Sequence, residues 1–202
     1  MDVARLAGVS QKTVSRVLND EPYVSEELRR RVRQAAADLG YRLNHAARTL
    51  ASGRTRTIGV VTLGSALYGP SSILLGVERA ARRIGYALRV ATTDEGDPAG
   101  LARAVESLLG QGVEGIVVSE PIDEGTAVAV RVDIPVLVLG TPPPFPAATV
   151  VTVGGEAVRQ AQTATAHLLD LGHRTVHHLA GPPRWYAARD RLAGWRAALA
   201  DR

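Results

Sequence analysis

The stretch GVSQKTVSRVLN at residues 8–19 decides how the N-terminal part of the chain folds and which surface it presents. Gly8 can adopt the left-handed backbone that a tight turn needs, and Ser10 is a good N-cap because its side chain can accept from the first amides of a helix. The apolar residues of that helix share one face, at spacing i, i+3, i+4: Val14, Val17 and Leu18. Its polar face carries Gln11, Lys12, Ser15 and Arg16. An ordinary solvated surface helix would show the same pattern, so the flanking sequence has to decide.

The flanks predict two more helices. Residues 2–7 form a first short helical segment, and Ser25 caps a third that starts with two glutamates and ends at Gly40. Apolar residues along the three segments can form a small core: Val3 or Ala4, Leu6, Val9, Val14, Val17, Leu18, Val24, Leu28, Val32, Ala36 and Leu39. The third segment also carries a cluster that fits an exposed, solvated face or a contact with DNA: Arg29, Arg30, Arg31 and Arg33.

Charge and composition narrow the classes of protein. Residues 1–56 hold 11 Lys and Arg against 6 Asp and Glu, a net +5, whereas residues 57–202 hold 13 against 14, a net −1. The helical part is therefore the basic part, as a phosphate-binding module should be. The absence of Cys excludes disulfides, zinc fingers and thiol catalysis. An uncharged run at residues 58–77 is interrupted by Gly, Pro and Ser, so we expect a cytoplasmic protein with no membrane partner.

From Thr57 onward, short apolar runs alternate with helical segments. Strands are predicted at residues 58–63, 88–92, 115–119 and 136–139, with helices at 73–85, 99–111 and 126–132. Asp97 and Pro98 fit the N-cap and first turn of the second of these helices. Such alternation predicts an α/β fold with a doubly wound parallel sheet. The run TPPPFPAAT at 141–149 then fits a crossing into a second lobe, with a strand at 150–153, a helix at 155–171, a strand at 175–180 and a helix at 187–200.

The order and spacing of DVARLA, GVSQKTVSRVLN, VSEELRRRVRQAAADLGY and NHAARTLASGRTRTIGVV resemble the lac repressor family of bacterial transcription factors. The resemblance implies an all-α helix-turn-helix head at residues 1–43 and a hinge helix with linker at 44–56. It also implies a core like the type I periplasmic binding proteins, with a first lobe at 57–147 and the start of a second at 148–202. The family's second lobe continues further, so the resemblance implies a chain truncated in that lobe, or a fragment.

The resemblance assigns two kinds of DNA contact to the head. The family's base-reading positions fall on Gln11, Lys12 and Arg16, and these side chains suit the task, because Gln can bond adenine and Arg or Lys can bond guanine in the major groove. Positions that contact phosphates, and so fix register without reading sequence, fall on Thr13, Ser15, Asn19 and Ser25.

The hinge is a third DNA contact implied by the family. Residues 44–51 are too few to hold an isolated helix in water. In the family this segment folds on the operator, pairs with its twin in a dimer and inserts a leucine into the minor groove. The matching residues are Asn44, Ala47, Arg48 and Leu50, with Leu50 as the inserted side chain. The alternative is a flexible linker whose Leu50 packs on the core.

An effector would bind in the cleft between the lobes. By resemblance Arg191 would contact effector hydroxyls, and Leu63, Tyr68 and Pro70 could line the cleft. The alternative for Arg191 is an ordinary surface arginine. The family suggests a carbohydrate, but Gly140 replaces a carboxylate that would hold a sugar, so the effector's identity stays open.

These patterns predict a repressor that binds a near-palindromic operator as a homodimer and responds to a small molecule. We expect no cofactor and no enzymatic activity. His173, His177 and His178 are not expected to bind a metal, since neighbouring residues of a strand point to opposite faces. Three alternatives stay open: a sugar-binding protein without a regulatory role, a sugar-modifying enzyme, and a fragment that binds DNA weakly or constitutively.

Overall fold

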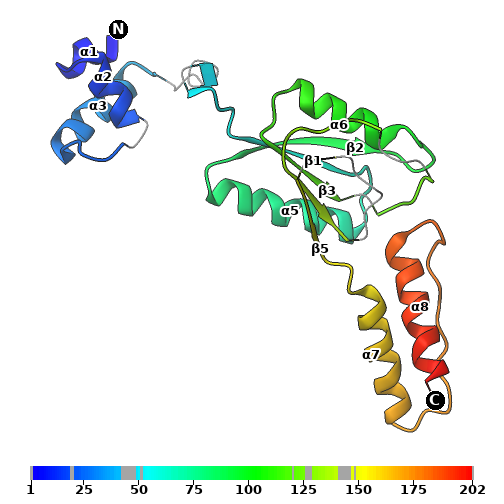
Figure 1. Ribbon diagram of the computed structural model, residues 1–202. Coiled ribbons are helices and arrows are strands. Elements are labelled where there is room, and N and C mark those ends of the chain that lie inside the picture. Colours follow the sequence, from blue (N-terminus) through cyan, green and yellow to red (C-terminus); the bar gives the residue numbers. More distant parts are fainter. Residues whose placement is uncertain are drawn as a thin grey trace. The chain divides into compact units, whose positions relative to one another are not determined.

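The computed structural model describes residues 2–18, 21–41, 49–50, 52–119, 121–125, 129–140, 147 and 149–201. It divides into two compact units, Met1–Arg54 and Thr55–Arg202, and each is described by itself. Helices and strands carry the labels of Figure 1.

The first unit contains three short helices that meet around a small core (Figure 1). They are α1 (Asp2–Ala7), α2 (Gln11–Leu18) and α3 (Glu26–Asp38). The buried residues are Val3, Ala7, Val17, Val32, Ala35 and Ala36. Leu6 and Leu39 were expected in this core, but they are 55% and 46% exposed. In α1 the inward stripe is taken by Val3 and Ala7, four residues apart, and Leu39 lies in the turn that ends α3.

Both ends of α3 are closed as the sequence predicts. At the N-terminus the Ser25 side chain accepts from the backbone N–H of Leu28. At the C-terminus Gly40 has φ +58°, and its N–H donates to Ala37 O at 3.0 Å. The N–H of Tyr41 donates to Ala36 O at 2.8 Å, which completes a Schellman turn.

The second unit is built on a five-stranded sheet in which every pairing is parallel, in the order β2-β1-β3-β4-β5. The strands are β1 (Thr57–Leu63), β2 (Ala87–Thr93), β3 (Gly115–Ser119), β4 (Val136–Leu139) and β5 (Val150–Val153). Two helices, α5 (Tyr68–Arg83) and α6 (Gly100–Gly110), lie on opposite sides of the sheet (Figure 1). The doubly wound fold is confirmed, and the carboxyl ends of the strands share one edge of the sheet.

The main core lies between α6 and the sheet. Its fully buried side chains include Val61 from β1, Leu108 from α6 and Val118 from β3. Gly59 of β1 allows α6 to approach closely, because a Cβ there would lie 2.9 Å from a methyl group of Leu108. This packing fixes the ends of the strands, and so the starting points of the loops that follow them at the edge of the sheet.

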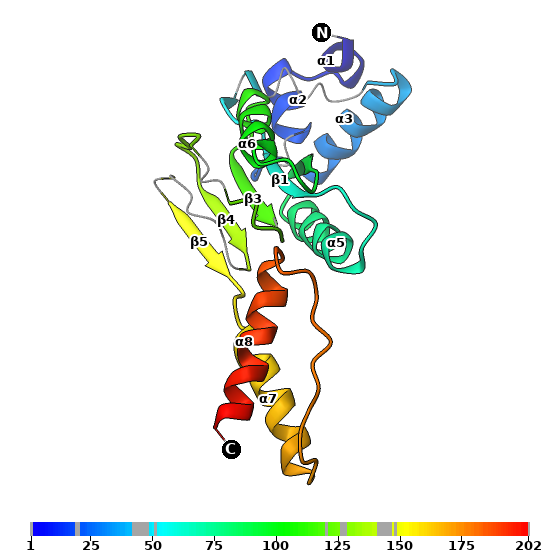
Figure 2. The same ribbon diagram turned by 90° about the vertical axis from the view of Figure 1, so that its right-hand side faces the viewer.

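The helices α7 (Ala157–Asp170) and α8 (Tyr186–Ala200) follow the sheet and lie side by side. They run in the same direction, and the extended segment 173–185 runs back alongside them from the end of α7 to the start of α8 (Figures 1 and 2). The indole N–H of Trp195 in α8 donates to Val176 O of that segment at 2.8 Å. The two helices touch at Gly194, where an added Cβ would lie 2.0 Å from Val158 O.

The structure corrects the predicted start of the second lobe. The strand at 150–153 is the fifth strand of the first sheet, since β5 pairs with β4 from Val136↔Val150 to Leu139↔Val153. Residues 175–180, predicted as a strand, are extended but belong to no ladder. An apolar run specifies an extended backbone but does not specify its hydrogen-bonded neighbour, which is why both assignments were wrong.

Three smaller predictions also differ. The helix expected at 73–85 begins earlier, at Tyr68. Asp97 does not cap α6; the cap position is Ala99 without a side-chain bond, and the Asp97 carboxylate pairs with Arg103 instead. Of the helix expected at 126–132, residues 126–128 lie outside the described part of the chain, and 129–132 are not helical; Val132 pairs with Ala147 in an isolated bridge.

Over the described ranges, no helix has both the length and the apolar character needed to cross a bilayer.

Candidate nucleic-acid interface

The turn before α2 is held by backbone and side-chain bonds. Gly8 has φ +62°, and the N–H of Val9 donates to Ala4 O at 3.0 Å. Arg31 of α3 donates from Nη2 to Ala7 O at 2.6 Å, so a side chain from the third helix ties down the last carbonyl of α1. The angle at which α2 leaves this turn is therefore set by contacts with both neighbouring helices.

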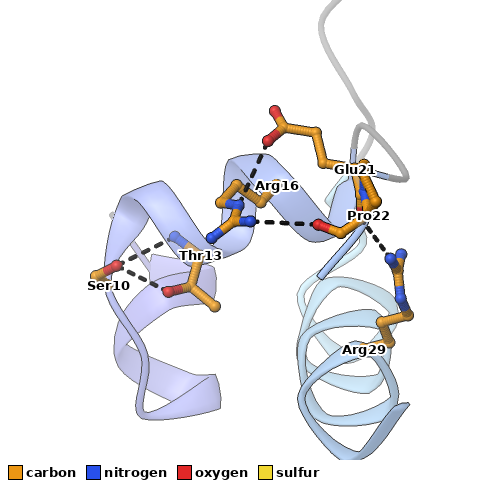
Figure 3. Close-up of polar contacts among 6 residues, drawn as sticks. All are labelled: Ser10, Thr13, Arg16, Glu21, Pro22 and Arg29. Carbon is orange, nitrogen blue, oxygen red and sulfur yellow. Dashed lines mark hydrogen bonds and ion pairs between the residues drawn. The ribbon is translucent and has the colours of Figure 1, made fainter. Parts of the chain in front are cut away.

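The first turn of α2 is capped as predicted. Ser10 Oγ accepts from the backbone N–H of Thr13 at 3.1 Å and lies 2.9 Å from Thr13 Oγ1 (Figure 3). Thr13 was predicted to contact a phosphate; here its hydroxyl is paired with Ser10, and either oxygen can be the donor. The Ser10–Thr13 pair thus places two hydroxyls and the open end of a helix at one surface, where an anion would be favoured.

The two faces of α2 differ as the sequence predicts. Val17 is 1% exposed and packs into the head. Gln11 and Lys12, at the start of the helix, are exposed on the other face. Two of the three predicted base-reading side chains can therefore reach a ligand without any change in the head.

Arg16, the third predicted base reader, is already in contact with the turn that follows α2. Its Nε lies 3.4 Å from Glu21 Oε2, and its Nη2 donates to Pro22 O at 3.2 Å (Figure 3). Its side chain is 38% exposed. Sequence analysis did not single out Glu21, although a carboxylate five residues after an arginine at a helix end was a signal available to it.

The remaining phosphate candidates are only partly visible. Ser15 is exposed on α2, and Ser25 is exposed while its oxygen caps α3. Asn19 lies outside the described residues. Arg29, expected on a solvated face, is instead largely buried, with 12% of its side chain exposed. It donates to the backbone carbonyls of Glu21 and, at 3.3 Å, Val24, so its role is to hold the turn before α3.

Of the four predicted hinge residues, Leu50 is the one that the structure describes. Asn44, Ala47 and Arg48 lie outside the described residues. Leu50 and its neighbour Thr49 are helical, and Leu50 is 89% exposed. An exposed leucine on a helical segment is what a minor-groove wedge would require.

The predicted effector residues lie at two places in the second unit. Leu63 ends β1 and is buried, with 6% exposed, and Pro70 is buried in the first turn of α5. Tyr68 is 87% exposed at the start of α5, and Arg191 is exposed on α8. Of these four side chains, Tyr68 and Arg191 are the ones accessible to a small molecule.

A set of ion pairs near the carboxyl ends of β2 and β3 was not predicted. Arg189 of α8 donates to Asp123 Oδ2 at 2.9 Å, and Arg184 pairs with Glu124. Glu124 also accepts from the N–H of Gly96 at 2.9 Å, which follows β2. These bonds tie the loops at the sheet edge to the start of α8. Acidic residues four and five positions after the end of β3 were the signal in the sequence, but their basic partners lie some sixty residues away.

The pKa of Asp123 is lowered by its surroundings. The backbone N–H of Gly125, 2.9 Å from Oδ1, and the Arg189 guanidinium hold the pKa of the Asp123 carboxyl below its ordinary value, more than offsetting its slight desolvation. The carboxylate therefore stays ionised at neutral pH and keeps its arginine.

Within the described ranges, no three His, Asp or Glu side chains gather as metal ligands would.

Comparison with known proteins supports the assignment of both units. Residues 1–44 match the family model for bacterial regulatory proteins of the lacI family, and residues 70–202 match the model for periplasmic binding proteins and the sugar-binding domain of that family. The chain belongs to the lac repressor family.

Individual family members match nearly the whole chain. The lactose operon repressor of Escherichia coli (strain K12) is 35% identical over 201 residues, which are 98% of this chain and 55% of that relative. The ribose operon repressor of the same strain is 34% identical over 200 residues, 98% of this chain and 60% of the relative. Both relatives are named as repressors.

Solved structures of family members share the fold. A crystal structure of the lac repressor dimer bound to operator and the anti-inducer ONPF is 32% identical, with a TM-score of 0.77, over 99% of this chain and 61% of that chain. A complex of the regulator CelR with cellobiose is 29% identical, with a TM-score of 0.53, over 99% of this chain and 60% of that chain. The chain thus spans between 55% and 61% of the length of these family members.

Proposed function

We propose that this chain is a sequence-specific DNA-binding regulator that acts as a transcriptional repressor. The observation that carries the proposal is the outward polar face of α2, where Gln11 and Lys12 are exposed at the start of a helix capped by Ser10. In helix-turn-helix proteins the first residues of the second helix reach base edges in the major groove. Gln and Lys can hydrogen-bond adenine and guanine there, and Arg16 adds a second guanine-reading group.

The charge of the head and hinge together supports binding to a duplex. Residues 1–56 carry a net +5, and removal of phosphate counterions by such a surface favours association with any DNA. Family members are named as repressors, and one solved relative is a dimer bound to its operator. By likeness to that relative, we propose that this chain also acts as a homodimer on a near-palindromic duplex.

The hinge would add a contact in the minor groove. An exposed apolar side chain such as Leu50 can enter between base steps and kink the duplex, and each inserted wedge lets more of the protein touch the DNA. In the proposed dimer, two such segments would contact the operator together.

A carbohydrate is the proposed effector. Ligands of doubly wound sheets bind beyond the carboxyl ends of the strands, and Tyr68 and Arg191 are accessible candidates to contact one. Relatives are named for lactose and ribose operons, and CelR was solved with cellobiose. The effector would shift the population between lobe arrangements and so change the spacing of the two hinges.

We infer a regulator rather than an enzyme, working in the cytoplasm where it meets the chromosome. The named relatives are repressors. Among the described side chains near the sheet edge, the carboxylates of Asp123 and Glu124 are already paired with arginines, which does not favour a role in acid–base chemistry.

Selection of duplexes from a random pool tests this function. The full chain is mixed with the pool, the bound fraction is amplified over several rounds, and the products are sequenced. Enrichment of one near-palindromic sequence is expected. A pool that stays random, from a chain shown by circular dichroism to be folded, would overturn the proposal.

A further inference from the structure

Within the head, Arg16 differs from the other two predicted base readers. Gln11 and Lys12 are exposed, but the Arg16 guanidinium is held by Glu21 Oε2 at 3.4 Å and by Pro22 O at 3.2 Å (Figure 3). Two roles for Glu21 are compatible with a contact of this kind. Glu21 could compete with DNA for Arg16, or it could hold Arg16 in the orientation that reads a base.

The atoms involved favour the second role. Nε and Nη2, the two nitrogens in contact with Glu21 and Pro22, form one edge of the planar guanidinium. Guanine O6 and N7 need only two N–H donors in a fork, and the end formed by Nη1 and Nη2 supplies such a fork. Arg16 can therefore keep its contact with Glu21 while its other end bonds guanine.

The backbone of Glu21, whose carboxylate contacts Arg16, is held by bonds from two sides. The backbone N–H of Glu21 donates to Arg16 O at 2.9 Å, which ties the turn to the end of α2. From the other side, the largely buried Arg29 donates to Glu21 O and to Val24 O. The carboxylate that contacts Arg16 thus comes from a backbone held by both α2 and α3 (Figure 3).

The Arg16–Glu21 pair should matter more for binding than for folding. Glu21 is 49% exposed, and exposed ion pairs contribute little to stability because water screens them. Arginine has many rotamers, however, and a side chain ordered before it meets its ligand loses less entropy on binding. The resulting gain in binding free energy should then appear only at the base pair that Arg16 contacts.

We propose that Glu21 is a positioning residue for Arg16, which fixes the guanidinium for one base pair and thereby sets the specificity of the head. The proposal rests on the proposed function, since it requires Arg16 to read a base. It predicts that Glu21 affects discrimination between base pairs through Arg16 and not through the net charge of the head.

The test uses the full chain and the duplex enriched from the random pool, together with variants of that duplex changed at one base pair each. The proteins are the wild type, Glu21→Ala, Glu21→Gln and Glu27→Ala. Glu27 is exposed in the first turn of α3, so its removal takes the same charge from the same head and serves as the matched control. Affinities for all duplexes are measured at one salt concentration.

Glu21→Ala is expected to lower the preference at one base pair by about three- to tenfold, a part of what a bidentate arginine–guanine pair supplies. Glu21→Gln retains an acceptor for Nε and should recover part of that preference. Glu27→Ala should leave every preference unchanged. In an Arg16→Ala background, Glu21→Ala should have no further effect at that base pair.

Three results would overturn the inference: an undiminished preference in Glu21→Ala, a raised preference, which would make Glu21 a competitor, or an equal loss at every base pair. Thermal unfolding of each variant separates the last result from loss of the fold. If the wild type itself selects no duplex, the proposed function fails and the inference with it. If the wild type selects a duplex and Glu21→Ala retains its full preference, only the inference fails.

Discussion

At the scale of single residues, the arginines of the head serve different purposes although the sequence places them close together. Arg31 holds the last carbonyl of α1, and Arg29 holds the turn before α3. Arg16 contacts Glu21 and Pro22 at the surface. The charge of the head is therefore divided between support of its backbone and contact with a partner.

Asp123 provides a residue-scale prediction on pH. Because its pKa is lowered in the folded chain, its ion pair with Arg189 stabilises the fold above the ordinary Asp value of 3.8 and loses that effect as the pH falls below it. Asp123→Asn should therefore unfold at a lower temperature than the wild type at pH 7. The difference in melting temperature between the variant and the wild type should become smaller in acid. Melting temperatures of both proteins from pH 7 to about pH 3 measure this difference. A difference that stays constant with pH would contradict a stabilising role for the ionised Asp123 carboxylate.

Sequence reasoning identified residues whose role is local and missed those whose partners are distant. Gly8, Ser10 and Ser25 act within a few positions of themselves, in turns and caps, and all three behave as predicted. Arg29 was assigned to a solvated face, because its contacts with carbonyls five and eight positions earlier depend on how α3 packs.

At the scale of elements, the pair α7 and α8 depends on one close approach. At Gly194 any side chain would meet the backbone carbonyl of Val158, which lies 2.0 Å from the position of an added Cβ. Helices packed this closely need a residue without a side chain at the crossing. The indole of Trp195 in α8 then bonds the extended segment 173–185 to this pair of helices.

Gly194→Ala is therefore expected to push the two helices apart and lower the free energy of unfolding by about 1–3 kcal/mol or more. The matched control is Gly110→Ala, at the end of α6, where an added Cβ meets nothing within 4 Å. That change should be neutral or slightly stabilising, since alanine favours a helix more than glycine does. Urea unfolding of both variants tests the difference; equal stability of the two would show that the contact at Val158 is not rigid.

Element types were predicted better than element partners. The strands β1 to β4 and the helices of the head follow from periodicity and caps, because these signals are local. Membership of β5 in the first sheet, and the absence of a ladder at 175–180, depend on which chain segments lie beside them. The boundary of the second lobe, predicted at residue 148, was placed too early for the same reason.

At the scale of the whole chain, positive charge is concentrated in the N-terminal quarter of the sequence. The net +5 of residues 1–56 contrasts with −1 for residues 57–202, a difference that the sequence alone revealed. The sequence also predicted the order of head, hinge and core. The effector and the operator could not be predicted, since each depends on the chemistry of a bound partner.

This separation predicts steep dependence on salt. Affinity for the selected duplex should fall by roughly a hundredfold or more between about 50 and 200 mM salt, because each counterion that phosphate contacts release gains less entropy when the surrounding salt is more concentrated. Fluorescence anisotropy with a labelled duplex measures the slope. An affinity that hardly changes over this range would mean that the basic head is not the binding surface.

The central claim is that the outward face of α2 reads base pairs, and Arg16→Ala tests it most directly. The affinities of this variant and the wild type are compared on the selected duplex and on every single base-pair variant of it. Arg30→Ala, which removes an exposed arginine from α3, is the control for charge. Arg16→Ala should lose about 1–3 kcal/mol of discrimination at one base pair and keep its other preferences. An equal loss of affinity for the selected duplex and for unrelated DNA, with every preference intact, would contradict the account.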